Sequence, residues 1–152
     1  MKFERIRVVL LLLLIFSIQF TFSGFKSVDR GDVVILIEGV KSDKGELILA
    51  LFNDKDSYLK KDYMHKKVKV DKVGNATVTF ESLPMGEYSV SVIHDVNENG
   101  KLDKNVVGVP KEGFGFSNVS LGWFGPPSYD NTKFELSSEN VKVTVKLKHL
   151  YI

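Results

Sequence analysis

Apolar and polar residues alternate strictly in four stretches of the chain, and this alternation decides the fold class. An apolar residue occupies every second position, with lysine, threonine, serine or aspartate between, in residues 67–71, 77–80, 88–92 and 141–148. Successive side chains of a β-strand point to opposite faces, so one face of each segment lies against a core and the other faces water. A helix would scatter the same residues around its axis. The sequence therefore predicts strands that are buried on one side.

Further segments bring the expected number of strands to about seven. Residues 32–40 are rich in branched side chains and predict a strand buried on both faces. The turn residues 41–46 and the apolar run 47–53 predict that a second strand forms a hairpin with it, and residues 133–137 predict a short strand. Residues 54–66 lose strand character and predict a short helix or an irregular crossing between sheets. Short strands joined by turns favour an all-β sandwich.

The phrase "LPMGEYSVSV", residues 83–92, narrows the choice of sandwich. Pro84 and Gly86 make a turn, and Tyr88 follows at the start of a strand, where its hydroxyl can bond back across the corner as in immunoglobulin-like domains. The phrase also resembles the Leu-Pro-x-Gly-x-Tyr-x-Val pattern of transthyretin-like and carboxypeptidase-regulatory-like domains, which are non-catalytic. We therefore predict an antiparallel β-sandwich, immunoglobulin-like or transthyretin-like, of about seven strands. Because any hairpin can carry such a phrase, it bears on the fold alone.

Residues 1–23 have the layout of a secretory signal peptide. A basic start precedes the apolar run 8–16, and more polar residues follow up to a cut site that we place after Ser23. An uncleaved membrane anchor is the alternative, but polar residues interrupt the run before it reaches the length of a spanning helix. Residues 24–31 then form a lead-in and residues 32–152 a single domain. We expect a protein exported to the periplasm or the cell exterior, with no membrane insertion after cleavage.

Charge and cysteine content limit the partners and the source of stability. Without the signal peptide, which holds three of the 21 basic and one of the 19 acidic residues, 18 of each remain and the chain is formally neutral. Nucleic-acid binding needs a concentrated basic face, and none is visible. The chain has no cysteine, so its core must stabilise it without disulfides. The expected partner is a protein or a glycan of the cell envelope, not a nucleic acid.

The stretch "HDVNENGKLD", residues 94–103, has the ligand spacing of a calcium-binding loop. In the twelve-residue loop, positions 1, 3 and 5 supply side-chain oxygens, position 6 is glycine, position 7 supplies its carbonyl oxygen, and position 9 often binds through water. Gly100 stands at position 6, and Leu102 is the apolar residue expected to hold the loop to the core. The candidate calcium ligands are Asp95, Asn97, Asn99, Lys101 and Asp103.

The calcium pattern is incomplete. Val106 occupies position 12, where a bidentate glutamate is required, and the break at residues 108–110 forbids a following helix, so the segment is not an EF-hand. It is either a calcium loop between strands, completed by Glu98, Glu112, Asp130 or water, or a polar turn in which Asp and Asn side chains cap the backbone. With few carboxylates, a calcium site here is expected to be weak, with a dissociation constant of roughly 10⁻⁴ to 10⁻³ M.

The aromatic segment 112–131 is a second candidate surface. It places five aromatic residues among glycines and prolines: Phe114, Phe116, Trp123, Phe124 and Tyr129. Exposed, the last three would form a platform for a sugar, a peptide or another protein. Buried, they would close the open end of the sandwich, which we favour because large aromatic side chains are mostly buried. Long loops on rigid scaffolds often carry function.

No stretch of the chain carries a catalytic motif. The sequence contains neither Gly-x-Ser-x-Gly nor His-Glu-x-x-His, and His65, His94 and His149 have no metal-ligand spacing. The stretch "GFGF", residues 113–116, lacks the third glycine and the following helix of a nucleotide-binding loop. We therefore expect a protein that is not an enzyme and binds no organic cofactor, with calcium as the one candidate ion.

The phrases "HDVNENGKLDKN" and "GVPKEGFGFSN", within residues 94–118, resemble the signature of the bacterial domain-of-unknown-function 2141 family. The resemblance covers most of residues 33–148. It implies an exported protein with a signal peptide and one β-sandwich domain, and it supplies no catalytic residue. We expect a binding or interaction module with a calcium-loop-like segment at residues 95–103. The alternative is a carbohydrate or small-molecule binding module that uses residues 112–131. An enzyme is a third, less favoured interpretation.

Overall fold

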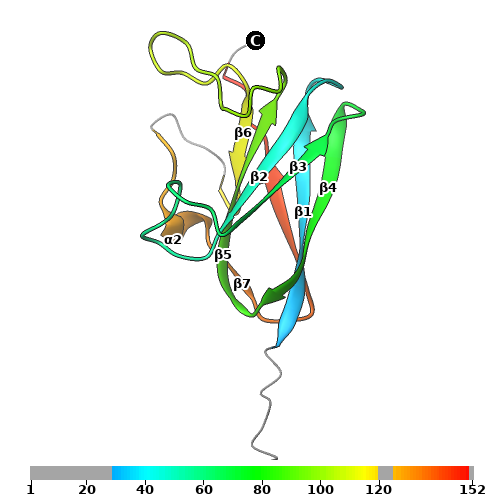
Figure 1. The fold of residues 1–152 in the computed structure, drawn as a ribbon, viewed down its shortest axis with the longest axis vertical. Coiled ribbons are helices and arrows are strands. Elements are labelled where there is room, and N and C mark those ends of the chain that lie inside the picture. Colours follow the sequence, from blue (N-terminus) through cyan, green and yellow to red (C-terminus); the bar gives the residue numbers. More distant parts are fainter. Residues whose placement is uncertain (1–28, 120–124, 151–152) are drawn as a thin grey trace, which may run out of the picture.

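The computed structural model describes residues 29–119 and 125–150, and these form two β-sheets packed face to face (Figure 1). The elements are β1 (Arg30–Val40), β2 (Glu46–Phe52), β3 (Met64–Lys69), β4 (Gly74–Pro84), β5 (Gly86–Asp95), β6 (Gly113–Phe116), α2 (Tyr129–Thr132), β7 (Phe134–Leu136) and β8 (Asn140–Lys146). The prediction of an all-β sandwich is confirmed. The predicted signal peptide lies outside the described residues.

The two sheets differ in how their strands pair. One has the order β4-β1-β8, and the other has the order β3-β2-β5-β6, with β7 adding to β5. Every pair is antiparallel except β1 with β8, which run parallel over residues 32–38 and 140–146. The predicted hairpin between residues 32–40 and 47–53 is wrong, because β1 and β2 belong to different sheets. Their apolar faces meet across the core instead of lying side by side.

The core lies between the sheets and is built from alternate residues of five long strands. The fully or nearly buried side chains include Val33, Ile35, Ile37, Leu47, Leu49, Leu51, Val78, Phe80, Val90, Val92, Val143 and Val145. The expectation that β1 is buried on both faces is wrong, because Leu36 on its other face is 37% exposed. Val68 is equally exposed although its alternation predicted an inward position, since β3 is an edge strand.

Two connections position the strands that matter later. Tyr88 is buried at the β4–β5 corner and its hydroxyl donates to the Pro84 carbonyl at 2.7 Å, as the phrase at residues 83–92 predicted. Residues 53–63 form turns that join β2 to β3 within one sheet, so the predicted helix or crossing between sheets at residues 54–66 is wrong. None of the described helices is long and apolar enough to cross a membrane.

Candidate binding pocket and the adjoining loop

The strand β6 was missed by the sequence analysis, which left residues 112–131 outside the strand count. Its sequence alternates glycine and phenylalanine; Gly115 faces β8, and Gly113 faces the side chain of His149, which follows β8. A β-carbon on Gly115 would lie 2.7 Å from the Lys146 carbonyl oxygen, so the side chain must be absent for the backbones to approach. The signal was present in "GFGF" as a period of two. This alternation predicts a strand if the glycines, which have no side chain, are taken as the residues of its inner face.

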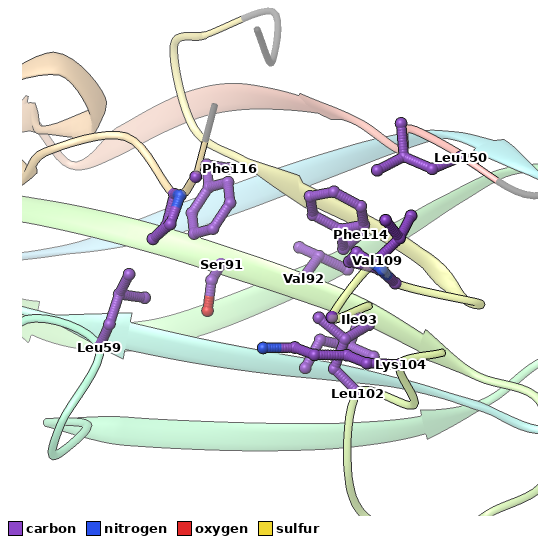
Figure 2. A pocket seen from close by; sticks show the side chains of 14 residues that line it. Leu59, Ser91, Val92, Ile93, Leu102, Lys104, Val109, Phe114, Phe116 and Leu150 are labelled. Carbon is purple, nitrogen blue, oxygen red and sulfur yellow. The ribbon is translucent and has the colours of Figure 1, made fainter. Parts of the chain in front are cut away.

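The outward side chains of β5 and β6 form the floor of a pocket with a volume of about 500 Å³ (Figure 2). Ser91 pairs with Phe116 and Ile93 with Phe114 across the two strands, so all four side chains share the outer face of the five-stranded sheet. One wall is the loop at residues 102–110, which lies in the connection between β5 and β6, and the others come from more distant parts of the chain, namely Leu59, residues 125–126 and Leu150. The fold therefore assembles the pocket from segments that no local motif connects.

The pocket is lined mostly by apolar side chains, with two polar exceptions. Ser91 and Lys104 are the polar side chains among the lining residues that the structure describes. In Figure 2 the Lys104 side chain extends beside Ile93, and its ammonium group points toward the side of the pocket that holds Leu59. Neither the Ser91 hydroxyl nor the Lys104 ammonium makes a hydrogen bond or an ion pair with another described residue.

The loop that follows β5 brings together the side chains predicted to bind calcium, and it joins them by hydrogen bonds. Asp95 is fully buried and accepts from the backbone N–H groups of Asn99 (3.2 Å) and Gly100 (2.6 Å). The side-chain amides of Asn97 and Asn99 donate to the two oxygens of Asp103 at 2.7 and 3.0 Å. The backbone N–H of Lys101 donates to the Asn99 side-chain oxygen at 2.8 Å. The cluster thus has the internal bonding of a capped polar turn.

Glu112 joins the two ends of this loop by hydrogen bonds. Its side chain is buried and accepts from the backbone N–H groups of Val96 and Asp103, each at 3.0 Å. The sequence offered Glu112 only as an additional ion ligand, and its role as a clamp across both ends of the loop was missed. Of the other two donors considered, Glu98 pairs with Lys69, and Asp130 lies within α2 and pairs with Lys55.

The surroundings of the loop set limits on cation binding. No group of three or more His, Cys, Asp or Glu side chains in the described ranges is arranged to hold a metal ion. A β-carbon on Gly100 would lie 3.8 Å from the Lys67 ammonium, so a positive charge already stands beside the loop. A hydrogen bond to Glu46 (2.8 Å) raises the pKa of Lys67, which keeps that charge in place.

The aromatic candidates separate into different places. Phe114 and Phe116 lie together in the pocket. Tyr129 is buried in α2, where its ring packs edge-on against Tyr58 and its hydroxyl donates to the Glu87 carbonyl at 3.2 Å. Burial raises the pKa of Tyr129, as expected for a phenol held away from water. Tyr129 therefore does not form an exposed platform. Trp123 and Phe124 lie outside the described residues.

A family model described as an uncharacterized protein conserved in bacteria (DUF2141) matches residues 35–144 of the chain. The match extends from β1 to β8 and includes the whole loop and β6. The chain belongs to this family, as residues 94–118 suggested. Neither a curated protein nor a solved structure matches the chain at a significant level.

Proposed function

We propose that this protein is an exported, non-enzymatic module that binds a small, largely apolar molecule. The pocket on the outer face of β5 and β6 is the observation that carries the proposal. Its volume of about 500 Å³ lies in the range of small-molecule sites, roughly 300–1,000 Å³, and such sites are mostly apolar with a few polar groups. Phe114 and Phe116 in its floor support the role expected for the aromatic segment.

The lining favours a small molecule over the other partners considered from sequence. A carbohydrate needs many polar contacts, whereas this pocket offers only the Ser91 and Lys104 side chains among its described lining. A protein partner needs a broad contact area, about 800 Å² on each side, and walls from several segments restrict access to the floor here. The site therefore suits a compact ligand that enters between the loops.

Binding is tested with Nile red, an uncharged dye whose emission rises in apolar surroundings. We expect saturable binding that Ser91→Leu abolishes, because the larger side chain fills the pocket floor without entering the core. Thr144→Leu is the matched control, since Thr144 is exposed on β8 in the other sheet. Absence of saturable binding, or equal binding by both variants, contradicts the proposed function.

We also propose that calcium binds weakly at the 95–103 loop. The convergence of Asp95, Asn97, Asn99 and Asp103 supports this proposal. Ion binding requires the Asn97 and Asn99 amides to rotate by half a turn, so that their oxygens replace the nitrogens that now face Asp103. The neighbouring Lys67 ammonium opposes a cation, which agrees with a dissociation constant of roughly 10⁻⁴ to 10⁻³ M.

The calcium proposal is tested by thermal unfolding. Millimolar calcium should raise the melting temperature of the native chain and leave that of Asp95→Ala unchanged. Asp95 also caps two backbone N–H groups, so the variant is less stable from the start and the informative quantity is the calcium-dependent increment. No increment in the native chain at millimolar calcium refutes the site.

Export is proposed from residues 1–23 alone. Expression of the full chain in a bacterium should give a mature protein in the periplasm or the medium that begins at Gly24. Mass spectrometry of the exported protein measures this start. A protein that keeps Met1 and stays with the cytoplasm or the inner membrane contradicts the proposal.

A further inference from the structure

We infer that the pocket takes an anionic amphiphile, a single apolar chain that ends in a carboxylate, with the acid group held by Lys104. This inference rests on the proposed binding function and names the class of ligand. The observation that carries it is an apolar floor in the same pocket as the Lys104 ammonium group, which has no hydrogen-bond or ion-pair partner among the described residues.

The apolar part of the pocket suits a hydrocarbon chain. Ile93, Phe114 and Phe116 form a continuous apolar floor, and Leu102 and Val109 face it from the neighbouring loop (Figure 2). Phe114 and Ile93 keep part of their surface open to the pocket, although their strands β6 and β5 are paired with each other. Covering this surface is favourable by the hydrophobic effect alone and needs no directional contact.

The described lining of the pocket carries positive charge and no negative charge. Lys104 is the charged residue among the described lining, which includes no aspartate or glutamate. The nearest acid in sequence, Asp103, already accepts from Asn97 and Asn99 and forms no ion pair with Lys104. An uncharged ligand that covered the floor would also remove water from the Lys104 ammonium group, for which the described residues supply no counter-charge, and this is unfavourable. A carboxylate at the same place forms a charge-assisted hydrogen bond and offsets that cost.

The dimensions favour a free amphiphile over a segment of a macromolecule. Segments far apart in the chain supply walls beside the floor, and a narrow chain can lie on the floor between them. Ser91 lies in the floor, and its hydroxyl, which bonds to none of the residues that the structure describes, can donate to the second oxygen of the same carboxylate. A linear fatty carboxylate of medium length meets both conditions.

Decanoate and decanol test the inference, since they share the chain and differ in the head group. Affinities are measured by calorimetry, below the concentration at which decanoate forms micelles. We expect decanoate to bind about tenfold more tightly than decanol, as one added charge-assisted contact provides. Lys104→Gln should lower the decanoate affinity about tenfold and leave decanol unchanged. Lys111→Gln is the matched control, because Lys111 is exposed nearby and does not line the pocket.

Each result separates the inference from the proposed function. Equal affinities for decanoate and decanol, both insensitive to Lys104→Gln, overturn the inference while the binding function stands. A variant that weakens both ligands equally also overturns it, because Lys104 would then support the pocket wall and not the acid group. If neither ligand nor Nile red binds, the proposed function fails together with the inference. A decanoate advantage that shrinks with added salt supports the ion pair.

Discussion

The Glu112 side chain is the most informative single perturbation of the loop beside the pocket. Each of its carboxylate oxygens accepts one backbone N–H, from Val96 at the start of the loop and from Asp103 near its end. Glu112→Gln keeps the size of the side chain but replaces one oxygen with an NH₂ group. One of the two N–H groups then faces a donor in a buried place, and the other loses a charged acceptor.

The magnitude follows from these two contacts. A hydrogen bond to a charged group contributes about 1.5–3 kcal/mol, and a neutral one about 1 kcal/mol. Losing one charged bond and weakening the other should lower the free energy of unfolding by about 2–4 kcal/mol. That is a large part of the roughly 5–15 kcal/mol that stabilises a typical domain.

Urea denaturation followed by circular dichroism measures the effect, and Glu98→Gln is the matched control. Glu98 lies in the same loop, but it is exposed and pairs only with the exposed Lys69, so its substitution should cost about 0–1 kcal/mol. Hydrogen exchange at the Val96 and Asp103 amides should accelerate in Glu112→Gln alone. If the two variants unfold within about 0.5 kcal/mol of each other, the clamp does not stabilise the fold and the reasoning is wrong.

Three further predictions concern the sandwich. Gly115→Ala should lower the free energy of unfolding by about 1–3 kcal/mol in thermal melts. The added β-carbon would contact the Lys146 carbonyl oxygen, and this oxygen cannot move away because it belongs to the backbone. Tyr88→Phe should cost about 1 kcal/mol in urea unfolding through loss of the 2.7 Å bond to Pro84; an unchanged midpoint would show that the corner bond is dispensable. Burial lowers the pKa of His149 below 6.5, so its contribution is complete above about pH 6.5 and is lost as the pH falls through the folded pKa; urea midpoints should fall on acidification, and less steeply in His149→Gln.

Local sequence patterns predicted where the strands lie, but they could not predict which strands pair with each other. Alternation at residues 77–80, 88–92 and 141–148 identifies the inner faces correctly, but the expected solvent face of residues 88–92 is wrong, because Ser89 is fully buried and bonds to Thr132. Which strands become neighbours depends on contacts between distant residues, and short turns at residues 41–45 suit a hairpin as well as a crossing between sheets. The parallel alignment of β1 with β8 has no signature in either strand.

The candidate site divides in the same way. Ligand spacing located the side chains of Asp95, Asn97, Asn99 and Asp103 that converge, because their separation along one loop sets their geometry. The pocket was beyond sequence reasoning, since its walls meet only after both sheets have formed. Lys104, which belongs to no motif in the sequence, acquires a position beside Phe114 and Ile93 only through that tertiary arrangement.

The place of β1 has a consequence for the order of events in folding. β1 is the first described strand along the chain, yet it lies in the middle of its sheet, and β8, the last strand, forms one of its two edges. During synthesis this edge stays open, with a row of branched side chains beside unpaired backbone groups, until residues 140–146 arrive. A chain cut before Asn140 should therefore pair with other chains and aggregate. The three-stranded sheet can be completed only after residues 140–146 have been made, which makes its folding late and collective.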